Sequence, residues 1–389
     1  MSVSSGTMGA SLTQEILSSL GLANKTAAWG TLGTLRTFLS FSVDKDVQKL
    51  LKAITGQVLG LSVSITTPHH TLSQAGFKSA VILLQQFPKG WDYRARAIML
   101  HCVAHSTIVD VLTNRSREQR QLISRAFQER TKQDLLKSLQ AALSGNLEKI
   151  VVALLQPAAQ FDAQELRTAL KASGSAKDVA LEILATRAAP RLQECLAVYK
   201  HDFQVEAQED IRTETNGILQ DLLLALSKGG RERYSGVIDY SLEERDVQVL
   251  QQTGGSSMAG QWVLIFTQRS PEHLIRVFDQ YRRCTGQELE DAVQNCFHGD
   301  VQRALLSLVS IMRNTALYFA NKLHQALQET EPNFQVLMRI LISRSETDLL
   351  SIRAEFKRKF GKSLYSSLQD AMRGDCHSAL LALCRAEDI

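Results

Sequence analysis

The feature of this chain that most constrains its fold is one spacing pattern that occurs four times. An arginine is followed by an aromatic residue after 12 positions and by a glycine after 30 positions. The four sets are Arg115/Phe127/Gly145, Arg187/Tyr199/Gly217, Arg269/Tyr281/Gly299 and Arg344/Phe356/Gly374. Surface loops vary in length, whereas packed helices with short joints do not, so the constant spacing predicts four similar helical units. The intervals between successive arginines are longer than those of ordinary solenoid repeats, which indicates a small helical domain in each repeat rather than a helix pair.

The composition agrees with an all-helical globular protein. Among 389 residues, 44% are apolar and only 6 are proline, and apolar runs such as residues 150–155 are too short to span a membrane. The start of the chain lacks a basic cluster followed by an apolar run, so we expect a cytoplasmic protein without a secretory signal. The net charge of +4 is too weak to indicate nucleic-acid binding but is compatible with an anionic lipid surface.

The repeated aromatic residue belongs to an apolar stripe with helical periodicity. In the second unit the stripe contains Leu192, Leu196, Tyr199 and Phe203, and in the fourth unit it contains Leu349, Ile352, Phe356 and Phe360. Such stripes face a protein core, so the aromatic ring is predicted to be a packing residue rather than a surface for ligand stacking.

Several residues predict where helices begin and end. Asp162 and Glu165 have the spacing of a capping box, and Pro190 suits the first turn of a helix. The repeated glycine is expected between two helices, where the backbone needs a positive φ.

Longer segments resemble the repeats of the annexin family. These segments are LTNRSREQRQLISRAF, KSLQAALSGNLEKIVVALL, FDAQELRTALKASGS, TALYFANKL and SRSETDLLSIRAEFKRKFGKSLY, and the resemblance runs from about Asp44 to the end. It implies an all-α curved disc of four five-helix repeats whose convex face meets phospholipid. The expected organisation is a tail at 1–43, repeats at 44–156, 157–228, 237–315 and 316–389, and a linker at 229–236.

The resemblance also implies where calcium would bind. Annexin repeats hold calcium with carbonyl oxygens of a K-G-x-G-T loop and with a distant carboxylate, which suits the hard oxygen ligands that calcium prefers. Matching the pattern places the acidic residue shortly before the repeated glycine. The four matching residues are Ala142, Glu214, Cys296 and Ala371, so three of the four repeats lack the carboxylate.

The loops are degenerate as well. In the fourth repeat the loop reads Gln328-Glu329-Thr330-Glu331-Pro332, and in the third it reads Gly254-Gly255-Ser256-Ser257. The second repeat keeps a related loop, and its residual calcium candidates are Leu170, Ala172, Gly174 and Glu214. The resemblance therefore predicts weak or absent calcium binding and no other cofactor. Lys171, Ser173 and Lys177 are the candidate lipid-facing residues of this loop.

The first repeat contains an insertion at about residues 58–104. The stretch from Lys52 to Arg115 is much longer than the matching stretch from Lys171 to Arg187. Lengthening this loop costs only about 2 kcal/mol of closure entropy, so the repeat can fold around it. Disorder, an interfacial patch built on Phe87 and Trp91, and a variant transcript are the open interpretations.

The amino-terminal segment SLTQEILSSLGL is amphipathic. Leu12, Ile16, Leu17 and Leu20 lie along one side of the expected helix. The segment resembles a tail by which one annexin binds a small EF-hand dimer, and docking on the protein's own disc is the alternative.

These observations favour a non-enzymatic peripheral membrane protein. We expect it to bind acidic phospholipids such as phosphatidylserine with little or no calcium dependence, and to lie in the cytoplasm or, without a signal peptide, at the cell surface. Homo-oligomers are an open possibility, and nucleic acid is not an expected partner. The alternative is a protein-interaction scaffold that has lost lipid binding. An enzyme is disfavoured because no set of nucleophile, base and orienting group recurs at corresponding positions.

Overall fold

The computed structural model describes residues 33–34, 41–55, 105–252 and 258–386. Three predicted features lie outside these residues, and their predictions stay untested. They are the tail residues Leu12, Ile16, Leu17 and Leu20, the insertion at 58–104, and the third-repeat loop Gly254–Ser257.

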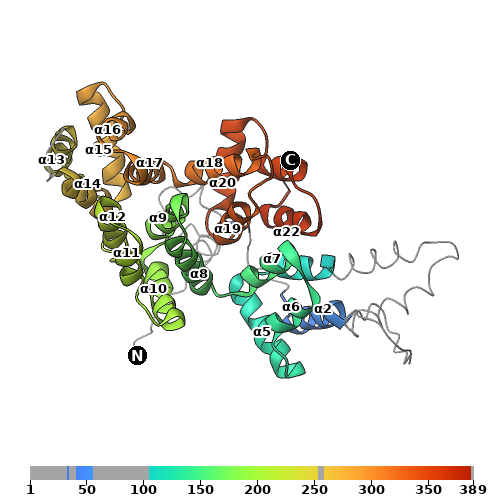
Figure 1. The fold of residues 1–389 in the computed structure, drawn as a ribbon. Coiled ribbons are helices and arrows are strands. Elements are labelled where there is room, and N and C mark those ends of the chain that lie inside the picture. Colours follow the sequence, from blue (N-terminus) through green and yellow to red (C-terminus); the bar gives the residue numbers. More distant parts are fainter. Residues whose placement is uncertain (1–32, 35–40, 56–104, 253–257, 387–389) are drawn as a thin grey trace, which may run out of the picture. The chain divides into compact units, whose positions relative to one another are not determined.

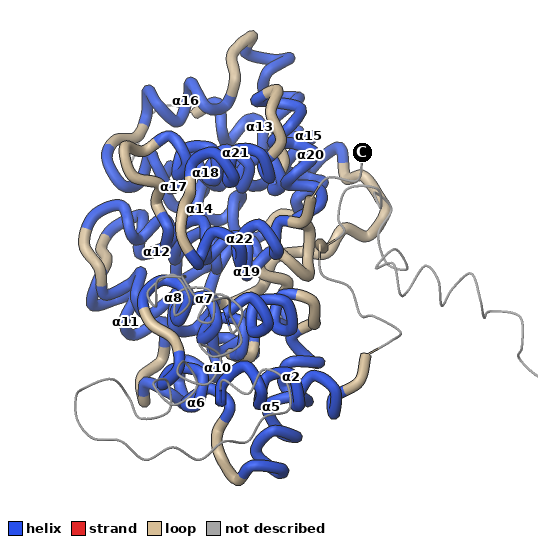
Figure 2. The backbone as a smooth tube through the Cα atoms, turned by 90° about the vertical axis from the view of Figure 1, so that its right-hand side faces the viewer, coloured by secondary structure: helices blue, strands red, loops and turns tan. Residues whose placement is uncertain are grey.

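The described chain is helical, with no strand among the described residues (Figure 2). It divides into two compact units, one formed by residues 1–156 and 320–389 and the other by residues 157–319. Within the described ranges, no helix combines the length and the apolar character that crossing a membrane requires.

Each repeat contains five helical segments in the same order, as the colours of Figure 1 allow the reader to follow. The first repeat has α2 (Val43–Thr55), helical residues 105–113, α5 (Arg117–Thr131), α6 (Leu135–Ala142) and α7 (Gly145–Leu155). The second has α8 (Ala158–Lys171), α9 (Lys177–Thr186), α10 (Ala189–Phe203), α11 (Ala207–Glu214) and α12 (Gly217–Ser227). The third has α13 (Tyr240–Gln251), α14 (Met258–Gln268), α15 (Pro271–Thr285), α16 (Leu289–Cys296) and α17 (Gly299–Arg313). The fourth has α18 (Thr315–Gln328), α19 (Phe334–Arg344), α20 (Leu349–Phe360), α21 (Leu364–Ala371) and α22 (Asp375–Cys384). The predicted all-α class with five helices per repeat is confirmed.

The repeated aromatic residue is a core residue in every repeat. Phe127, Tyr199, Tyr281 and Phe356 are all buried, on the third helix of their repeats. Tyr199 also contacts Phe203 edge to face, with ring centroids 4.9 Å apart. The packing role predicted from the helical stripes is therefore confirmed.

The repeated glycine lies at the start of the last helix of each repeat. Gly145, Gly217 and Gly299 are the first residues of α7, α12 and α17, with φ of 65°, 56° and 63°, and Gly374 precedes α22 with φ of 87°. A side chain is strained in this left-handed region, whereas glycine is not. The positive φ expected from the sequence is confirmed.

The repeated arginine forms a two-pronged ion pair with an aspartate. In the first three repeats the Nε and Nη2 atoms of the arginine donate to the two carboxylate oxygens of an aspartate on the first helix. The pairs are Arg115 with Asp46 (2.6 and 3.1 Å), Arg187 with Asp162 (3.0 and 2.9 Å) and Arg269 with Asp246 (2.7 and 3.2 Å). Each pair therefore ties the first helix of a repeat to the start of its third helix.

The fourth repeat makes the same kind of pair with a different aspartate. The position that corresponds to Asp162 of the second repeat is occupied by Phe319, which is fully buried. Arg344 instead donates to Asp348 on its carboxyl-terminal side, at 2.7 and 2.5 Å. Arg344 thus keeps a carboxylate partner, although the first helix of the fourth repeat has Phe319 in place of the aspartate.

The buried position of Asp162 corrects one expectation. Asp162 lies inside α8 rather than before its first residue, so the predicted capping box with Glu165 is wrong. Its side chain is completely buried and also accepts a hydrogen bond from Arg191 Nε at 2.8 Å. Pro190 does lie in the first turn of α10, as predicted.

Two described residues of the predicted tail contact the fourth repeat. The hydroxyl of Thr34 donates to the carbonyl oxygen of Leu383 at 2.7 Å. A Cβ atom on Gly33 would lie 2.4 Å from the carbonyl oxygen of Ser345, so only glycine fits this close approach of two backbones.

Candidate functional site

The candidate site is the connection between α8 and α9, which carries the second-repeat loop. The last residue of α8 is Lys171, and Ala172 follows in an extended conformation with its N–H bonded to the carbonyl of Thr168 at 3.0 Å. A short 3-10 turn, Gly174–Ala176, then leads into α9. Gly174 has a φ of 69° and is exposed, so it supplies backbone freedom at the apex of the loop.

The four residues at the predicted acidic position occupy equivalent places in their repeats. Glu214 is the last residue of α11, just as Ala142, Cys296 and Ala371 are the last residues of α6, α16 and α21. The fourth helix of each repeat therefore ends at this position, and only the second repeat presents a carboxylate there.

Lys171 joins Glu214 to the loop. Its Nζ atom lies 2.8 Å from Glu214 Oε1 and 2.8 Å from Asp210 Oδ1. The lysine side chain is 40% exposed and that of Asp210 only 6%. The carboxylate predicted as a calcium ligand thus lies beside the loop and is already paired with an ammonium group.

Asp210 is the centre of a small polar network. Besides Lys171, the hydroxyl of Tyr199 and the guanidinium of Arg167 contact its carboxylate. Burial by itself would raise the pKa of Asp210, but the hydrogen bonds from Lys171 and Tyr199 and the nearby charge of Arg167 hold the pKa below its ordinary value. The hydrogen bonds to Asp210 and Glu214 likewise raise the pKa of Lys171.

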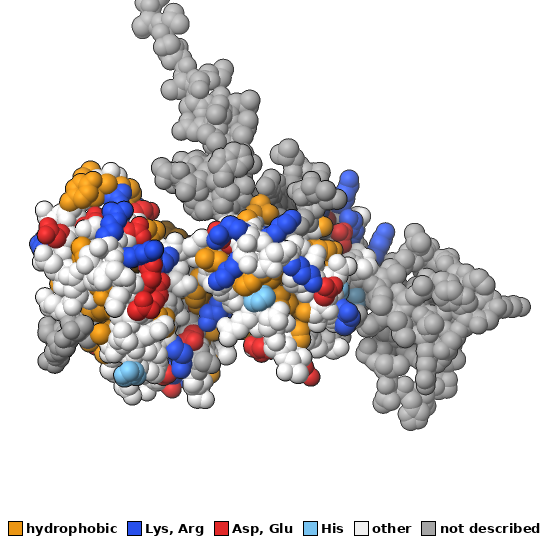
Figure 3. All heavy atoms as spheres, turned by 90° about the horizontal axis from the view of Figure 1, so that it is seen from above, with side chains coloured by type: hydrophobic (Ala, Val, Ile, Leu, Met, Phe, Trp, Pro, Cys, Tyr) orange, Lys and Arg blue, Asp and Glu red, His pale blue; other side chains and the backbone are white. Residues whose placement is uncertain are grey.

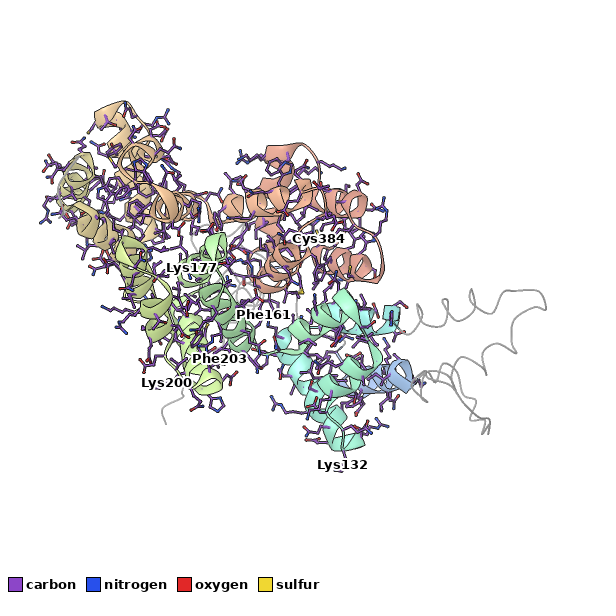
Figure 4. The ribbon with its side chains drawn as sticks, viewed as in Figure 1. Lys132, Phe161, Lys177, Lys200, Phe203 and Cys384 are labelled. Carbon is purple, nitrogen blue, oxygen red and sulfur yellow. The ribbon has the colours of Figure 1, made fainter. Side chains whose placement is uncertain are left out.

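Lys177 engages two carbonyl oxygens that were predicted to bind calcium. Its Nζ atom donates to the carbonyl of Leu170 at 3.0 Å and to that of Ala172 at 3.3 Å. Figure 4 labels Lys177 at the start of α9, beside α8. Ser173, the third candidate lipid-facing residue, is exposed at the loop surface.

This donor set does not fit calcium as it stands. Calcium requires roughly six to eight oxygen ligands, with carboxylate charge among them. Here the carbonyls of Leu170 and Ala172 accept hydrogen bonds from one ammonium group, and Glu214 is paired with another. A calcium ion would have to displace Lys177 and compete with Lys171.

The fourth-repeat loop has a different structure. Asn333 caps α19 by accepting a hydrogen bond from the N–H of Val336 at 3.3 Å, and its own N–H donates to the carbonyl of Ala326 at 2.9 Å. Glu329 and Glu331 are exposed. Across the described ranges, no three His, Cys, Asp or Glu side chains gather in a way that could hold a metal ion.

Sequence reasoning named Lys171 and Lys177 as lipid-facing residues but missed that Lys171 pairs with Glu214 and that Lys177 bonds two loop carbonyls. The aspartates that pair with the repeated arginines have a signal in the sequence, since Asp162 and Asp246 precede their arginines by similar intervals. The hydrogen bonds of Lys177 had no comparable signal, because its partners are backbone carbonyls, which every residue type has.

Comparison with known proteins gives a consistent result. The family model described as Annexin matches residues 96–154, 161–226, 257–308 and 318–383. The chain is 78% identical to Annexin A9 of Mus musculus and 70% identical to Annexin A9 of Homo sapiens, each over 389 residues and the full length of both chains. Among solved structures, it is similar to annexin III, with 30% identity, a TM-score of 0.76, and coverage of 92% of this chain and 98% of that chain.

Proposed function

Because the chain belongs to the annexin family, whose fold binds phospholipid and calcium, we propose that it is a non-enzymatic peripheral protein of acidic phospholipid membranes with weak or absent calcium dependence. The observation that carries the second half of this proposal is the donor set of the second repeat. Glu214 is paired with Lys171 at 2.8 Å, and the corresponding positions hold Ala142, Cys296 and Ala371.

Direct charge must then replace calcium bridging. A basic residue near an anionic leaflet contributes about 1 kcal/mol, so Lys171 and Lys177 together would contribute about 2 kcal/mol at most, which is weaker than millimolar affinity. Lys171 contributes less than this because two carboxylates share its charge. Further basic groups or self-association on the membrane must supply the remainder. The face drawn in Figure 3 carries basic side chains beside acidic ones. Any further basic groups would therefore attract lipid headgroups through local contacts rather than through one large basic surface.

Vesicle co-sedimentation tests this proposal. The full chain is mixed with phosphatidylserine vesicles in calcium and in chelator, with phosphatidylcholine vesicles as the control for charge. We expect similar co-sedimentation with phosphatidylserine in both conditions and little with phosphatidylcholine. Failure to bind phosphatidylserine in either condition would refute membrane attachment, and binding only in calcium would refute calcium independence.

A protein-interaction scaffold is the second candidate, and one surface observation favours it. Tyr234, Val237 and Tyr240, between α12 and the start of α13, have exposed fractions of 41%, 74% and 71%. Exposed large hydrophobic side chains that lie this close together in the sequence suit a protein partner. Under this candidate, replacing Val237 and Tyr240 by serine reduces partner capture while phosphatidylserine binding stays absent.

The remaining expectations belong with the proposal. An EF-hand dimer at the tail, a homo-oligomer, and a cytoplasmic or cell-surface location at membranes are compatible with a peripheral annexin. We propose no nucleic-acid partner and no cofactor besides weakly bound calcium.

A further inference from the structure

Lys177 lies at the amino-terminal end of a helix, which does not favour a basic residue. It is the first residue of α9, where the positive end of the helix dipole repels a basic group. Its side chain instead folds back toward the end of α8 and donates to the carbonyls of Leu170 and Ala172. These carbonyls lie at a helix carboxyl end, where backbone oxygens lack helical partners and the dipole is negative. The ammonium group therefore takes a site that attracts cations.

The charge of Lys177 is not neutralised there. Among the described residues no carboxylate forms an ion pair with Lys177, whereas Lys171 on the other side of the loop lies 2.8 Å from both Asp210 and Glu214. An ammonium group has three N–H donors, and the hydrogen bonds of Lys177 to the two carbonyls use two of them. One donor and a full positive charge remain beside an exposed loop that contains Ser173 and Gly174.

This arrangement has the two properties that a calcium ion supplies in a carbonyl-lined membrane site. It satisfies inward-facing carbonyl oxygens, and it presents positive charge to an anion outside. A lysine ammonium is a compact point charge that binds phosphate through a charge-assisted hydrogen bond. It carries half the charge of calcium but is covalently attached, so its presence does not depend on the calcium concentration.

We propose that the Lys177 ammonium is a built-in substitute for the calcium ion in the second repeat, held by the carbonyls of Leu170 and Ala172 and bonding the phosphate of an acidic phospholipid. This inference rests on the proposed membrane function and adds the residue and the headgroup chemistry. Lys177 binds lipid in this site, and Lys171 serves as the internal partner of Asp210 and Glu214.

The test compares two single-charge variants of the full chain. Lys177→Gln removes the proposed lipid contact. Lys200→Gln is the matched control, because Lys200 is an exposed lysine of α10 that lies outside the loop and pairs with Glu206. In chelator, we expect Lys177→Gln to weaken binding to mixed phosphatidylserine and phosphatidylcholine vesicles about fivefold, which corresponds to about 1 kcal/mol. Lys200→Gln should change the affinity less than about twofold, and Lys177→Arg, which keeps charge and donors, should bind like the wild type.

Other outcomes separate the alternatives. If Lys177→Gln lowers thermal stability or increases hydrogen exchange in residues 170–177 but leaves vesicle affinity unchanged, Lys177 only caps α8 and the inference is overturned. Equal weakening by both variants also overturns it, because charge alone would then explain the result. Titration with inorganic phosphate distinguishes the source: a heat that Lys177→Gln abolishes, with vesicle binding unchanged, assigns the site to soluble anions and overturns the lipid assignment.

The same experiment distinguishes failure of the Lys177 inference from failure of the proposed membrane function. Wild-type protein that fails to bind vesicles in chelator overturns both. Wild-type binding that persists in chelator, with an unaffected Lys177→Gln variant, overturns the Lys177 inference alone.

Discussion

Replacing Asp162 by alanine removes the carboxylate from the most deeply buried of the repeated ion pairs. The side chain of Asp162 is fully buried and that of Arg187 is 3% exposed, so water cannot solvate the guanidinium that would remain. Asp162 accepts hydrogen bonds of 2.9 and 3.0 Å from Arg187 and one of 2.8 Å from Arg191. Removing one partner of a buried pair typically costs about 3 to 5 kcal/mol, because the other charge is left buried and unpaired.

The expected loss is large enough to measure directly. The second compact unit spans residues 157–319, and for a unit of this size each kcal/mol corresponds to roughly 2 to 4 °C. Asp162→Ala should therefore lower the Tm of this unit by roughly 6 to 20 °C, as calorimetry can measure, and urea unfolding followed by circular dichroism gives the free energy directly. The same change at Asp246 should cost less, because its partner Arg269 is 13% exposed.

A double variant separates the cost of an unpaired charge from the loss of packing. Replacing Asp162 by leucine together with Arg187 by methionine removes both charges of the pair and keeps much of the volume. This variant should be more stable than Asp162→Ala. A loss below about 1 kcal/mol in Asp162→Ala, or a double variant that is less stable than the single one, would refute the reasoning.

Three further predictions concern pH, backbone and thiols. Burial alone would raise the pKa of Asp162, but the charges and hydrogen bonds of its two arginine partners lower the pKa to about 2 from 3.8. The stability that this ion pair gives the folded protein should therefore be complete above pH about 4 and be lost as the pH falls toward 2. Acid titration of the unfolding free energy of the wild type and of Asp162→Ala checks this. Gly217→Ala forces a side chain into a φ of 56° and should cost about 1 kcal/mol of unfolding free energy. Gly260→Ala lies inside α14 with open space around it and should be neutral or stabilising by about 0.5 to 1 kcal/mol. Urea unfolding measures both, and equal effects would contradict the role of φ. Burial raises the pKa of the Cys195 thiol to about 12, so iodoacetamide should label exposed Cys284 in the folded protein and Cys195 only after unfolding, as peptide mass analysis can show.

The features that the sequence predicted correctly depend on short-range regularities. The apolar stripe through Leu192, Tyr199 and Phe203 has the period of a helix, so the burial of Tyr199 follows from spacing alone. The positive φ of Gly217 follows in the same way, since a glycine between two helical patterns indicates a reversal of the backbone.

The prediction for Asp162 failed because local spacing was ambiguous. An acid followed by a glutamate one helical turn later is typical of a helix start, yet the helix begins at Ala158 and Asp162 faces the buried Arg187. The partner of a buried charge depends on which helices pack together. Asp162 pairs with Arg187, and the whole of α9 separates the two residues in the sequence.

The amino-acid sequence by itself determined four helical repeats, their aromatic core positions and the absence of a carboxylate at three of the four positions where the annexin resemblance implies a calcium ligand. Only the tertiary structure decided that Arg344 turns to Asp348, that Lys171 neutralises Glu214, and that Lys177 fills the carbonyl site. The physical reason is the range of the interactions. Periodicity and glycine conformation act within a few residues, whereas an ion pair forms wherever folding brings opposite charges within about 4 Å, and a carbonyl oxygen binds a cation regardless of which side chain its residue carries.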